Sequence, residues 1–375
     1  MTSEVLDRAL ILWFPGPATA TGEDLAELHC HGGRAVISAI HAELGALKGL
    51  RAAEPGEFTR RAFENGRMDL NAVEGLADLL AAETQAQRRA ALMMTEGHFS
   101  QQIDTWRQTL LHLSAQTEAA LDFSDEDDVP SSDIENAIQA QINDLCLRCK
   151  AALAVPPAER LRDGVRVVLA GPPNAGKSTL LNNLVGHDAA IVSDVAGTTR
   201  DRIEVAAAID GIAFLFTDTA GLHEGTGDVI ENIGMERARR AMDAADILLW
   251  LGDAAELPRH DAILIAAQSD CFAEDKRPGL SLSALTGEGM AALRATLLSL
   301  ASAILPAPDQ FALHKRQRDE VTLIISHLSQ AAMSSDFIIV AEELRLARNA
   351  VDRLTGRAGT EDLLDNLFSS FCIGK

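Results

Sequence analysis

One glycine-rich stretch, residues 171–179, constrains the fold of this chain more than any other. It reads Gly-Pro-Pro-Asn-Ala-Gly-Lys-Ser-Thr and follows an apolar, β-branched run at 165–170. The residues after it, 180–184, have apolar side chains at helical spacing. A strand, a loop of the form G-x-x-x-x-G-K-[ST] and a helix together make a phosphate-binding loop. The stretch therefore predicts a nucleotide site on an α/β sheet.

The residue types of this phosphate loop (171–179) suit a bound nucleoside phosphate. Gly171 and Gly176 let backbone N–H groups close around a phosphate, and the helix N-terminus adds a partial positive charge. Lys177 has the reach to contact the β- and γ-phosphates, and Ser178 offers a hydroxyl to Mg²⁺. A chance glycine-rich turn is the alternative, which the strand-loop-helix context disfavours. The predicted contacts are Asn174, Ala175, Gly176, Lys177, Ser178 and Thr179.

The sequence around the loop alternates strands and helices, as a doubly wound sheet does. Long amphipathic helical tracts precede and follow this α/β segment. We therefore predict one helical domain interrupted by an inserted α/β domain. Further strands are predicted at 10–14, 202–208, 212–217, 247–251, 262–267 and 280–282. Helices are predicted within 70–121 and at 133–153, 311–333, 337–355 and 360–371.

Two segments downstream of the loop resemble the switches of GTPases. Asp218-Thr219-Ala220-Gly221 ends a predicted strand, where Asp218 can hold Mg²⁺ through water and the Gly221 N–H can meet a γ-phosphate. Gly197-Thr198-Thr199-Arg200-Asp201 lies between the loop helix and the next strand. There Thr199 is the candidate for a second Mg²⁺ ligand, released on hydrolysis. Their order and spacing predict a GTPase of the Ras-like architecture.

The segment expected to recognise the base departs from the usual pattern. Such GTPases have Asn-Lys-x-Asp after the corresponding strand, and this chain has Ala267-Gln268-Ser269-Asp270. Asp270 still has a carboxylate that can accept the guanine N1–H and N2–H₂. Ser283 and Ala284 match the following Ser-Ala-Lys element without its Lys. The sequence therefore predicts a preference for guanine, with a reduced affinity for the nucleotide. The crossover from 251 to 262 leaves little room for a helix.

The residues expected to drive hydrolysis are also unusual. Leu222 occupies the position where Ras-like enzymes have a water-orienting Gln. Asn174 in the phosphate loop has an amide oxygen that can bind a monovalent cation, and Glu231 beyond the switch can orient a water. The alternative for Asn174 and Glu231 is an ordinary place on a loop surface.

The composition limits which partners the protein is expected to bind and indicates its cellular compartment. The net charge of −22 excludes a broadly basic surface that grips nucleic acid, and aromatic content of 4% disfavours stacking platforms for bases. The five cysteines are scattered, which predicts a reducing, cytoplasmic location. Cys146 and Cys149 have redox-motif spacing but lie in a helical pattern, so we interpret them as ordinary helix residues. The sequence has no signal peptide and no apolar run long enough to span a membrane, so no membrane partner is expected.

The first 66 residues predict an incomplete but compact α/β unit. His29-Cys30-His31 has the wrong spacing for a structural zinc site, and a strand-to-helix turn at Gly32-Gly33 is the preferred interpretation. Pro55-Gly56-Glu57-Phe58-Thr59 is a turn that begins a helix.

Several of these stretches together resemble the tRNA-modification GTPase family MnmE, also called TrmE. The resemblance spans nearly the whole chain and includes the GTPase motifs above. The matching stretches are Leu12-Trp13-Phe14-Pro15-Gly16-Pro17, Thr21-Gly22-Glu23-Asp24, His31-Gly32-Gly33, Pro55-Gly56-Glu57-Phe58-Thr59-x-Arg61-Ala62-Phe63, Asp122-Phe123 with Asp125-Glu126, and Phe371-Cys372-Ile373-Gly374-Lys375.

The resemblance implies a function, partners and four segments. A potassium-activated GTPase would act with MnmG, as a heterotetramer with two copies of each, to add a carboxymethylaminomethyl group at C5 of the wobble uridine of certain tRNAs. A homodimer would form through an N-terminal domain that binds 5-formyltetrahydrofolate or a related folate. The segments are the N-terminal domain at 1–66, the first stretch of a helical domain at 67–158, the G domain at 159–302 and the second stretch of the helical domain at 303–375.

The resemblance also implies site residues beyond those derived above. Its potassium ligands are Asn174, Ser193, Val195 and Thr198, within a nucleotide-binding segment of Ser193, Asp194, Val195, Ala196, Gly197, Thr198 and Thr199. Glu231 orients the water, and Cys372 is essential for modification. The folate contacts are Glu27, Arg67 (a Lys in the family pattern) and Lys375.

Two departures from the family leave rival functions open. Family members have a further N-terminal segment before Leu10, so the resemblance predicts a truncated folate domain here. One rival is a ribosome-assembly GTPase switch, although the sequence has no basic RNA-binding domain. The other is a degenerate, weakly hydrolysing scaffold, which Ala267 and Gln268 favour.

Overall fold

The computed structural model divides the chain into two compact units, each described by itself. Unit 1 comprises residues 1–80, 92–150 and 320–375, and unit 2 comprises residues 81–91 and 151–319. The structure describes residues 5–122, 131–186, 204–219, 228–272 and 277–357, with Asp365, Leu367, Phe368 and Phe371; at 131–132 and 228–234 it describes the backbone alone. The four segments predicted above stay a prediction.

The N-terminal region of unit 1 is a small antiparallel hairpin followed by a helix. Strand β1 (Leu10–Phe14) has the predicted bounds and pairs with β2 (Leu25–His29), which we did not predict as a strand. The chain then turns at Gly32-Gly33, as expected, into α1 (Arg34–Gly45). Most apolar side chains of β1 are exposed, Trp13 at 62%.

The rest of unit 1 is helical, as predicted. Its elements are α2 (Glu57–Glu64), α3 (Leu70–Ala81), a portion of α4 (Gln85–Thr95), α5 (His98–Asp122), α6 (Ser131–Ala154), α11 (Lys315–Met333) and α12 (Phe337–Leu354). Helix α2 begins at the predicted Pro55-Gly56 turn. The predicted helix at 360–371 lies mostly outside the described residues.

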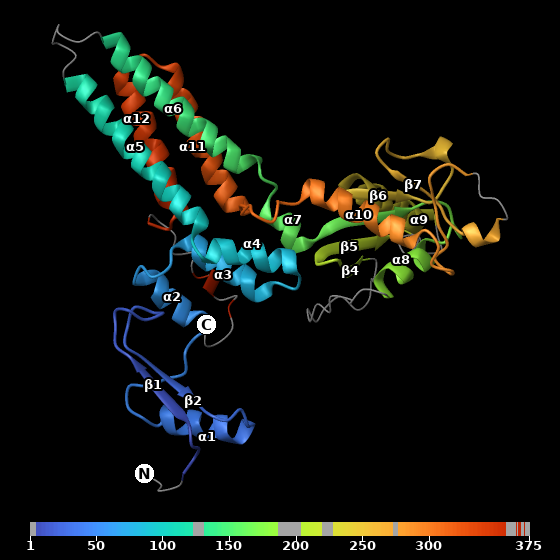
Figure 1. The fold of residues 1–375 in the computed structure, drawn as a ribbon, viewed down its shortest axis with the longest axis horizontal. Helices are drawn as coiled ribbons and strands as arrows, with labels where there is room; N and C mark the ends of the chain where they lie inside the picture. Colours follow the sequence, from blue (N-terminus) through green and yellow to red (C-terminus); the bar gives the residue numbers. More distant parts are fainter. Residues whose placement is uncertain are drawn as a thin grey trace. The chain divides into compact units, whose positions relative to one another are not determined.

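Helices α5, α6, α11 and α12 form a bundle (Figure 1). Buried side chains recur every three or four residues along each helix, the spacing of one apolar face. On α5 the Phe99 and Trp106 rings meet edge to face with centroids 6.1 Å apart. Arg107 on α5 donates to Asp352 on α12 at 3.3 Å. Segments more than 200 positions apart therefore share one core.

The core of unit 2 is a mixed sheet whose strands overlap the predicted ones. The strand order is β4-β5-β3-β6-β7-β8, parallel except for the β4–β5 pair. The strands are β3 (Val165–Ala170), β4 (Glu204–Ile209), β5 (Ile212–Asp218), β6 (Ile247–Trp250), β7 (Ile263–Ala266) and β8 (Leu280–Ser281). Because β3 is covered on both faces, it is apolar along nearly its whole length.

Helices cover both faces of this sheet (Figure 1). Apolar side chains of α7 (Ala158–Asp163), α8 (Lys177–Gly186) and α10 (Met290–Ile304) pack on one face. Helix α9 (Asp228–Ala244) packs on the other through Met242 and Ala245 beside its end. The β6–β7 crossover contains only the 3₁₀ turn η2 (Ala254–Glu256), which confirms that it is too short for the usual helix.

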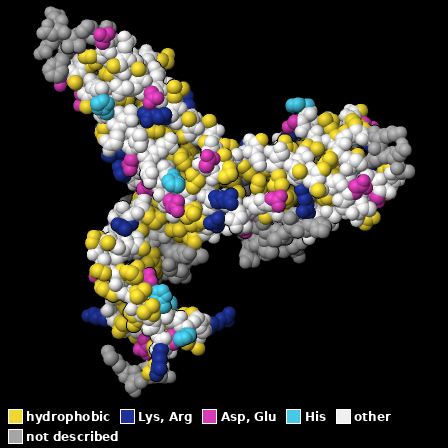
Figure 2. Space-filling model, in the orientation of Figure 1, with side chains coloured by type: hydrophobic (Ala, Val, Ile, Leu, Met, Phe, Trp, Pro, Cys, Tyr) yellow, Lys and Arg dark blue, Asp and Glu magenta, His cyan; other side chains and the backbone are white. Residues whose placement is uncertain are grey.

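On the face drawn in Figure 2, the Lys and Arg side chains of the described residues are dispersed among acidic and apolar ones and form no broad basic patch. Within the described regions of the chain, none of the helices combines the length and the apolarity of a membrane span. Cys146 and Cys149 lie buried on α6, and burial raises the pKa of the Cys149 thiol to about 12. These are core residues, as the helical interpretation predicted.

Candidate functional site

The phosphate loop lies where the sequence predicts it, between β3 and α8. Gly176 has φ +92°, a conformation that L side chains rarely adopt, and Asn174 has φ +61°. The Gly176 carbonyl accepts from the Leu180 N–H at 2.9 Å, which starts the helix. The fold therefore aims the first N–H groups of α8 at the loop, the arrangement that binds phosphate.

Lys177 opens α8 and is nearly fully buried, at 5% exposure. Its ammonium donates to the carbonyl oxygens of Gly171 at 2.9 Å and Pro172 at 2.8 Å. Burial lowers the pKa of Lys177, and the charge of Asp218 offsets some of that lowering. The cation is thus held at the loop with a compensating carboxylate nearby.

Ser178 and Asp218 meet although they are far apart in sequence. The Ser178 hydroxyl donates to Asp218 at 2.5 Å, and Asp218 ends β5. Thr219 is buried and donates to the Leu169 carbonyl on β3 at 2.9 Å, which fixes the strand end. A hydroxyl and a carboxylate are oxygen donors of the kind Mg²⁺ prefers, so this pair fits the predicted magnesium site.

The predicted base-recognition residues also come together. Asp270 lies on the 3₁₀ turn η3 (Ser269–Cys271), and a hydrogen bond from Ser283 lowers the pKa of its carboxyl. Ser283 is fully buried, and Asn183 on α8 donates to the Ala284 carbonyl at 2.8 Å. The Asp270 side chain itself is exposed and kept ionised, as a group that reads a base edge must be.

Other predicted site residues lie outside the described residues, and the structure does not place them. They are Ser193, Asp194, Val195, Ala196, Gly197, Thr198, Thr199, Ala220, Gly221, Cys372 and Lys375, with the side chain of Glu231. The backbone of Glu231 lies on α9.

The residues predicted to contact folate belong to unit 1. Glu27 lies on β2 with its carboxylate 3.0 Å from the His29 ring. Arg67 follows α2, and its N–H donates to the Ala62 carbonyl at 2.7 Å. Both side chains are exposed.

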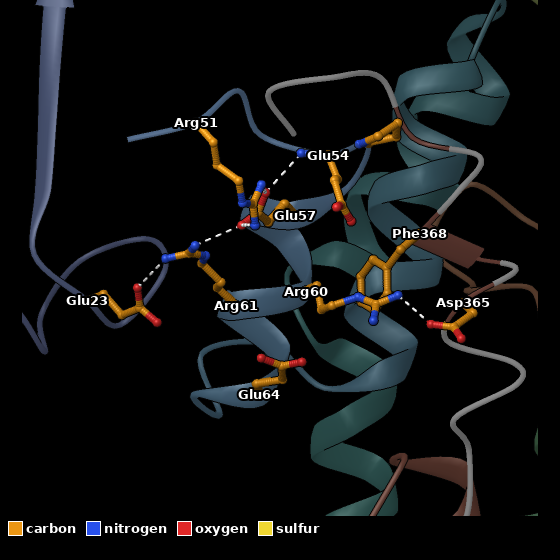
Figure 3. Close-up of a pocket in the computed structure, with 10 residues that line it drawn as sticks. Glu23, Arg51, Glu54, Glu57, Arg60, Arg61, Glu64, Asp365 and Phe368 are labelled. Carbon is orange, nitrogen blue, oxygen red and sulfur yellow. Dashed lines mark hydrogen bonds and ion pairs between the residues drawn. The ribbon is translucent and has the colours of Figure 1, made fainter. Parts of the chain in front are cut away.

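Unit 1 also has a charged cavity of about 630 Å³ beside α2 that sequence reasoning missed (Figure 3). Glu57 receives hydrogen bonds from Arg51 and Arg61, which lower the pKa of Glu57 to about 2. Arg61 also pairs with Glu23 at 2.8 Å. The alternating charges of the Pro55–Ala62 motif were visible, but not which charges pair.

The C-terminal segment closes one side of this cavity. Arg60 on α2 pairs with Asp365 at 2.6 Å, and its guanidinium lies 5.0 Å from the centroid of the Phe368 ring (Figure 3). Phe368 and Phe371 are buried against Val73 on α3. Among the described residues of this segment, Phe368 and Phe371 anchor it in the core, and Phe371 directly precedes Cys372.

Gly56, immediately before α2, packs closely against the backbone of Phe368. It has φ +70°, and a Cβ placed there would lie 2.6 Å from the Phe368 carbonyl oxygen. The glycine of the Pro-Gly-Glu-Phe-Thr motif is thus required by contact as well as by backbone conformation.

Comparison with known proteins gives consistent matches. A family model described as the MnmE helical domain matches residues 70–372, and one described as the GTP-binding protein TrmE N-terminus matches residues 1–67. The tRNA modification GTPase MnmE of Rhizorhabdus wittichii is 57% identical over 373 residues, covering 99% of this chain and 84% of the relative. That of Novosphingobium aromaticivorans is 54% identical over 381 residues, covering 99% and 87%. Among solved structures, the G domain of the T. maritima FeoB iron transporter is 25% identical, covering 36% of this chain and 98% of that chain with a TM-score of 0.28.

Proposed function

The chain belongs to the MnmE family of tRNA-modification GTPases, and from this premise we propose that it is a potassium-activated GTP hydrolase acting in tRNA modification. With the partner MnmG, in a complex with two copies of each, it adds a carboxymethylaminomethyl group at C5 of wobble uridine. The observation that supports GTP hydrolysis most directly is the meeting of Lys177, Ser178 and Asp218 at the phosphate loop. In this proposal unit 2 contains a Ras-like G domain inserted in the helical domain.

Each site residue has a definite task in the proposed hydrolysis. Lys177 turns from the Gly171 and Pro172 carbonyls toward the β- and γ-phosphates of GTP, because a phosphate oxygen is a stronger acceptor for an ammonium. Ser178 would hold Mg²⁺ directly and Asp218 through water, and the ion would neutralise charge that develops on the phosphate oxygens. Asp270 accepts from the guanine edge. Glu231 orients the attacking water. Ras-like enzymes use a Gln for this task, at the position that Leu222 occupies here.

Asn174 is the proposed potassium ligand among the described residues. It lies in the phosphate loop with φ +61°, and its side chain is exposed, so the amide oxygen is accessible to a cation. An amide oxygen suits a weakly hydrated monovalent cation. A positive charge beside the β- and γ-phosphates stabilises the transition state, as an arginine finger does. Ser193, Val195 and Thr198 complete this proposed site.

Hydrolysis is therefore expected to depend on the monovalent cation. We expect GTP turnover about tenfold or more faster in KCl than in NaCl of equal ionic strength. Asn174→Ala should lose this difference and retain nucleotide binding. Released phosphate measured in both salts checks this, and equal wild-type rates would contradict the potassium site. Undetectable hydrolysis in either salt would favour the scaffold instead.

Asp270→Asn is expected to relax the preference for guanine. The carboxylate accepts two hydrogen bonds from guanine, whereas an amide presents its own donor to one of them. The GTP-over-ATP preference should fall about 100-fold, since hydrogen bonds to a charged group are worth about 1.5–3 kcal/mol each. Competition between the nucleotides measures it. Unchanged selectivity would remove Asp270 from base recognition.

Unit 1 is proposed to hold the tRNA-modifying half of the protein. Glu27, Arg67 and Lys375 contact 5-formyltetrahydrofolate or a related folate. A carboxylate suits the N–H donors of its ring, and a guanidinium suits its glutamate. The protein forms a homodimer through the N-terminal domain and reaches tRNA through the complex with MnmG. The described cysteines are free, which supports a cytoplasmic location.

Cys372→Ser is expected to abolish tRNA modification and leave GTP hydrolysis near wild type. Phe371 anchors the chain immediately before the thiol, and Ser differs from Cys only by oxygen in place of sulfur, so the change is chiefly one of chemistry. The wobble-nucleoside content of tRNA from cells with only the Ser variant measures the effect. Normal modification would argue against a role of Cys372 in the chemistry. So would a loss of modification that is accompanied by a loss of thermal stability.

A further inference from the structure

The base-recognition loop, residues 267–272, lacks the two residues that usually hold such a loop on the phosphate loop. Ala267 is buried at 8% exposure, and its methyl group cannot make the hydrogen bonds of an Asn. Beside it lies a cavity of about 370 Å³ lined by Pro172 and Ala175 of the phosphate loop. The loop therefore needs other contacts if Asp270 is to stay in place.

Gln268 makes one of these contacts. It has φ +59°, and its amide Nε2 donates to the Asn174 carbonyl at 3.3 Å. A Cβ placed on Gly176 would lie 3.5 Å from the same nitrogen, so the amide lies directly over the phosphate loop. A neutral side chain thus reaches the loop from the position where Ras-like GTPases have a Lys.

Arg277 holds the other side of the base-recognition loop. Its Nη2 donates to the Ala267 carbonyl at 2.6 Å, and its guanidinium lies 4.1 Å from the centroid of the Phe272 ring. One side chain therefore contacts the first and the last residue of the loop. A hydrogen bond from a charged donor is stronger than one from a neutral donor, and the attraction of the guanidinium to the ring face adds to it.

Asp270 lies between these two fixed points. The Ser269 N–H donates to the Leu282 carbonyl at 3.1 Å, which ties the middle of the loop to the end of β8. We propose that Gln268 and Arg277 together replace the missing Asn-Lys pair and are the positioning residues that keep Asp270 on the guanine edge. This inference rests on the proposed GTP binding.

The test compares GTP with ITP, which lacks the 2-amino group that Asp270 accepts from. In Gln268→Ala and Arg277→Ala, GTP affinity should fall about tenfold, the value of one such hydrogen bond. ITP affinity should fall less, so the GTP-over-ITP ratio decreases. Gln268→Lys should keep the wild-type ratio because its ammonium also donates to the Asn174 carbonyl. Arg162→Ala, which removes an exposed guanidinium of the same unit, is the control.

A second variant keeps the test independent of folding. Ala267→Asn places an amide in the neighbouring cavity and should restore the GTP-over-ITP ratio in the Arg277→Ala background. Equal losses of GTP and ITP affinity, or wild-type affinities in both single variants, would overturn the inference. The proposed function would still hold, because the wild-type protein binds GTP. A wild-type protein that binds neither nucleotide would overturn the proposed function and this inference together.

Discussion

Lys177→Ala is expected to lower kcat/KM for GTP about 100- to 1000-fold, the usual effect of removing one preorganised donor from a transition state. The ammonium is buried and held at the phosphate loop by two loop carbonyls, so it has only to turn toward the phosphates when nucleotide binds. No other cationic side chain of the described phosphate loop can replace it.

Phosphate release at saturating potassium measures this effect. Lys150→Ala, which removes an exposed lysine from α6, is the matched control and should hydrolyse GTP at the wild-type rate. Hydrolysis by Lys177→Ala within about threefold of wild type would contradict the role of Lys177, since that factor corresponds to less than about 1 kcal/mol of transition-state stabilisation.

Gly56→Ala is expected to displace the C-terminal segment and abolish tRNA modification while GTP hydrolysis continues. The added Cβ meets the Phe368 carbonyl oxygen at 2.6 Å and its Cα at 3.0 Å, with φ at +70°. Either α2 or the Phe368 anchor must shift. We expect unit 1 to lose about 3 kcal/mol of unfolding free energy, from backbone strain together with disturbed packing.

Gly66→Ala separates the two causes. Gly66 has φ +67° but open space where a Cβ would be placed, so its variant experiences the backbone strain alone, about 1 kcal/mol. Denaturation followed by far-UV circular dichroism, with assays of wobble nucleosides, compares the variants. Equal losses of stability in both would show that the contact with Phe368 does not matter.

Local features of the fold were predictable from sequence. β1 and β3 have the expected bounds because each is an apolar run ended by glycine or proline. β2 was missed because Leu25–His29 has no β-branched residues, so its pairing with β1 determines its conformation. The contact of Phe368 with Gly56 joins distant segments, and a sequence pattern gives no information on such packing.

The candidate site shows the same division. The phosphate loop and the meeting of Ser178 with Asp218 follow from a motif whose geometry is fixed by its chemistry. The roles of Gln268 and Arg277 could not be predicted from the sequence. Each side chain donates to a backbone carbonyl that only the fold brings within hydrogen-bond distance. From Ala267 and Gln268 the sequence predicts a reduced affinity for the nucleotide, whereas the structure places a different donor at the same loop.

The shared core of α5 and α12 has a consequence for how the protein is made. Helix α5 ends at Asp122, and its partner begins at Phe337. The ribosome adds about 5–20 residues per second, so the roughly 200 residues between them take on the order of 10 to 40 s. During that time the apolar face around Trp106 has no α12 to cover it, and β3 through β8 are all synthesised before α12 begins. Unit 2 is therefore translated before the last helix of the bundle in unit 1, and the face of α5 that packs on α12 stays without that helix until translation nears its end.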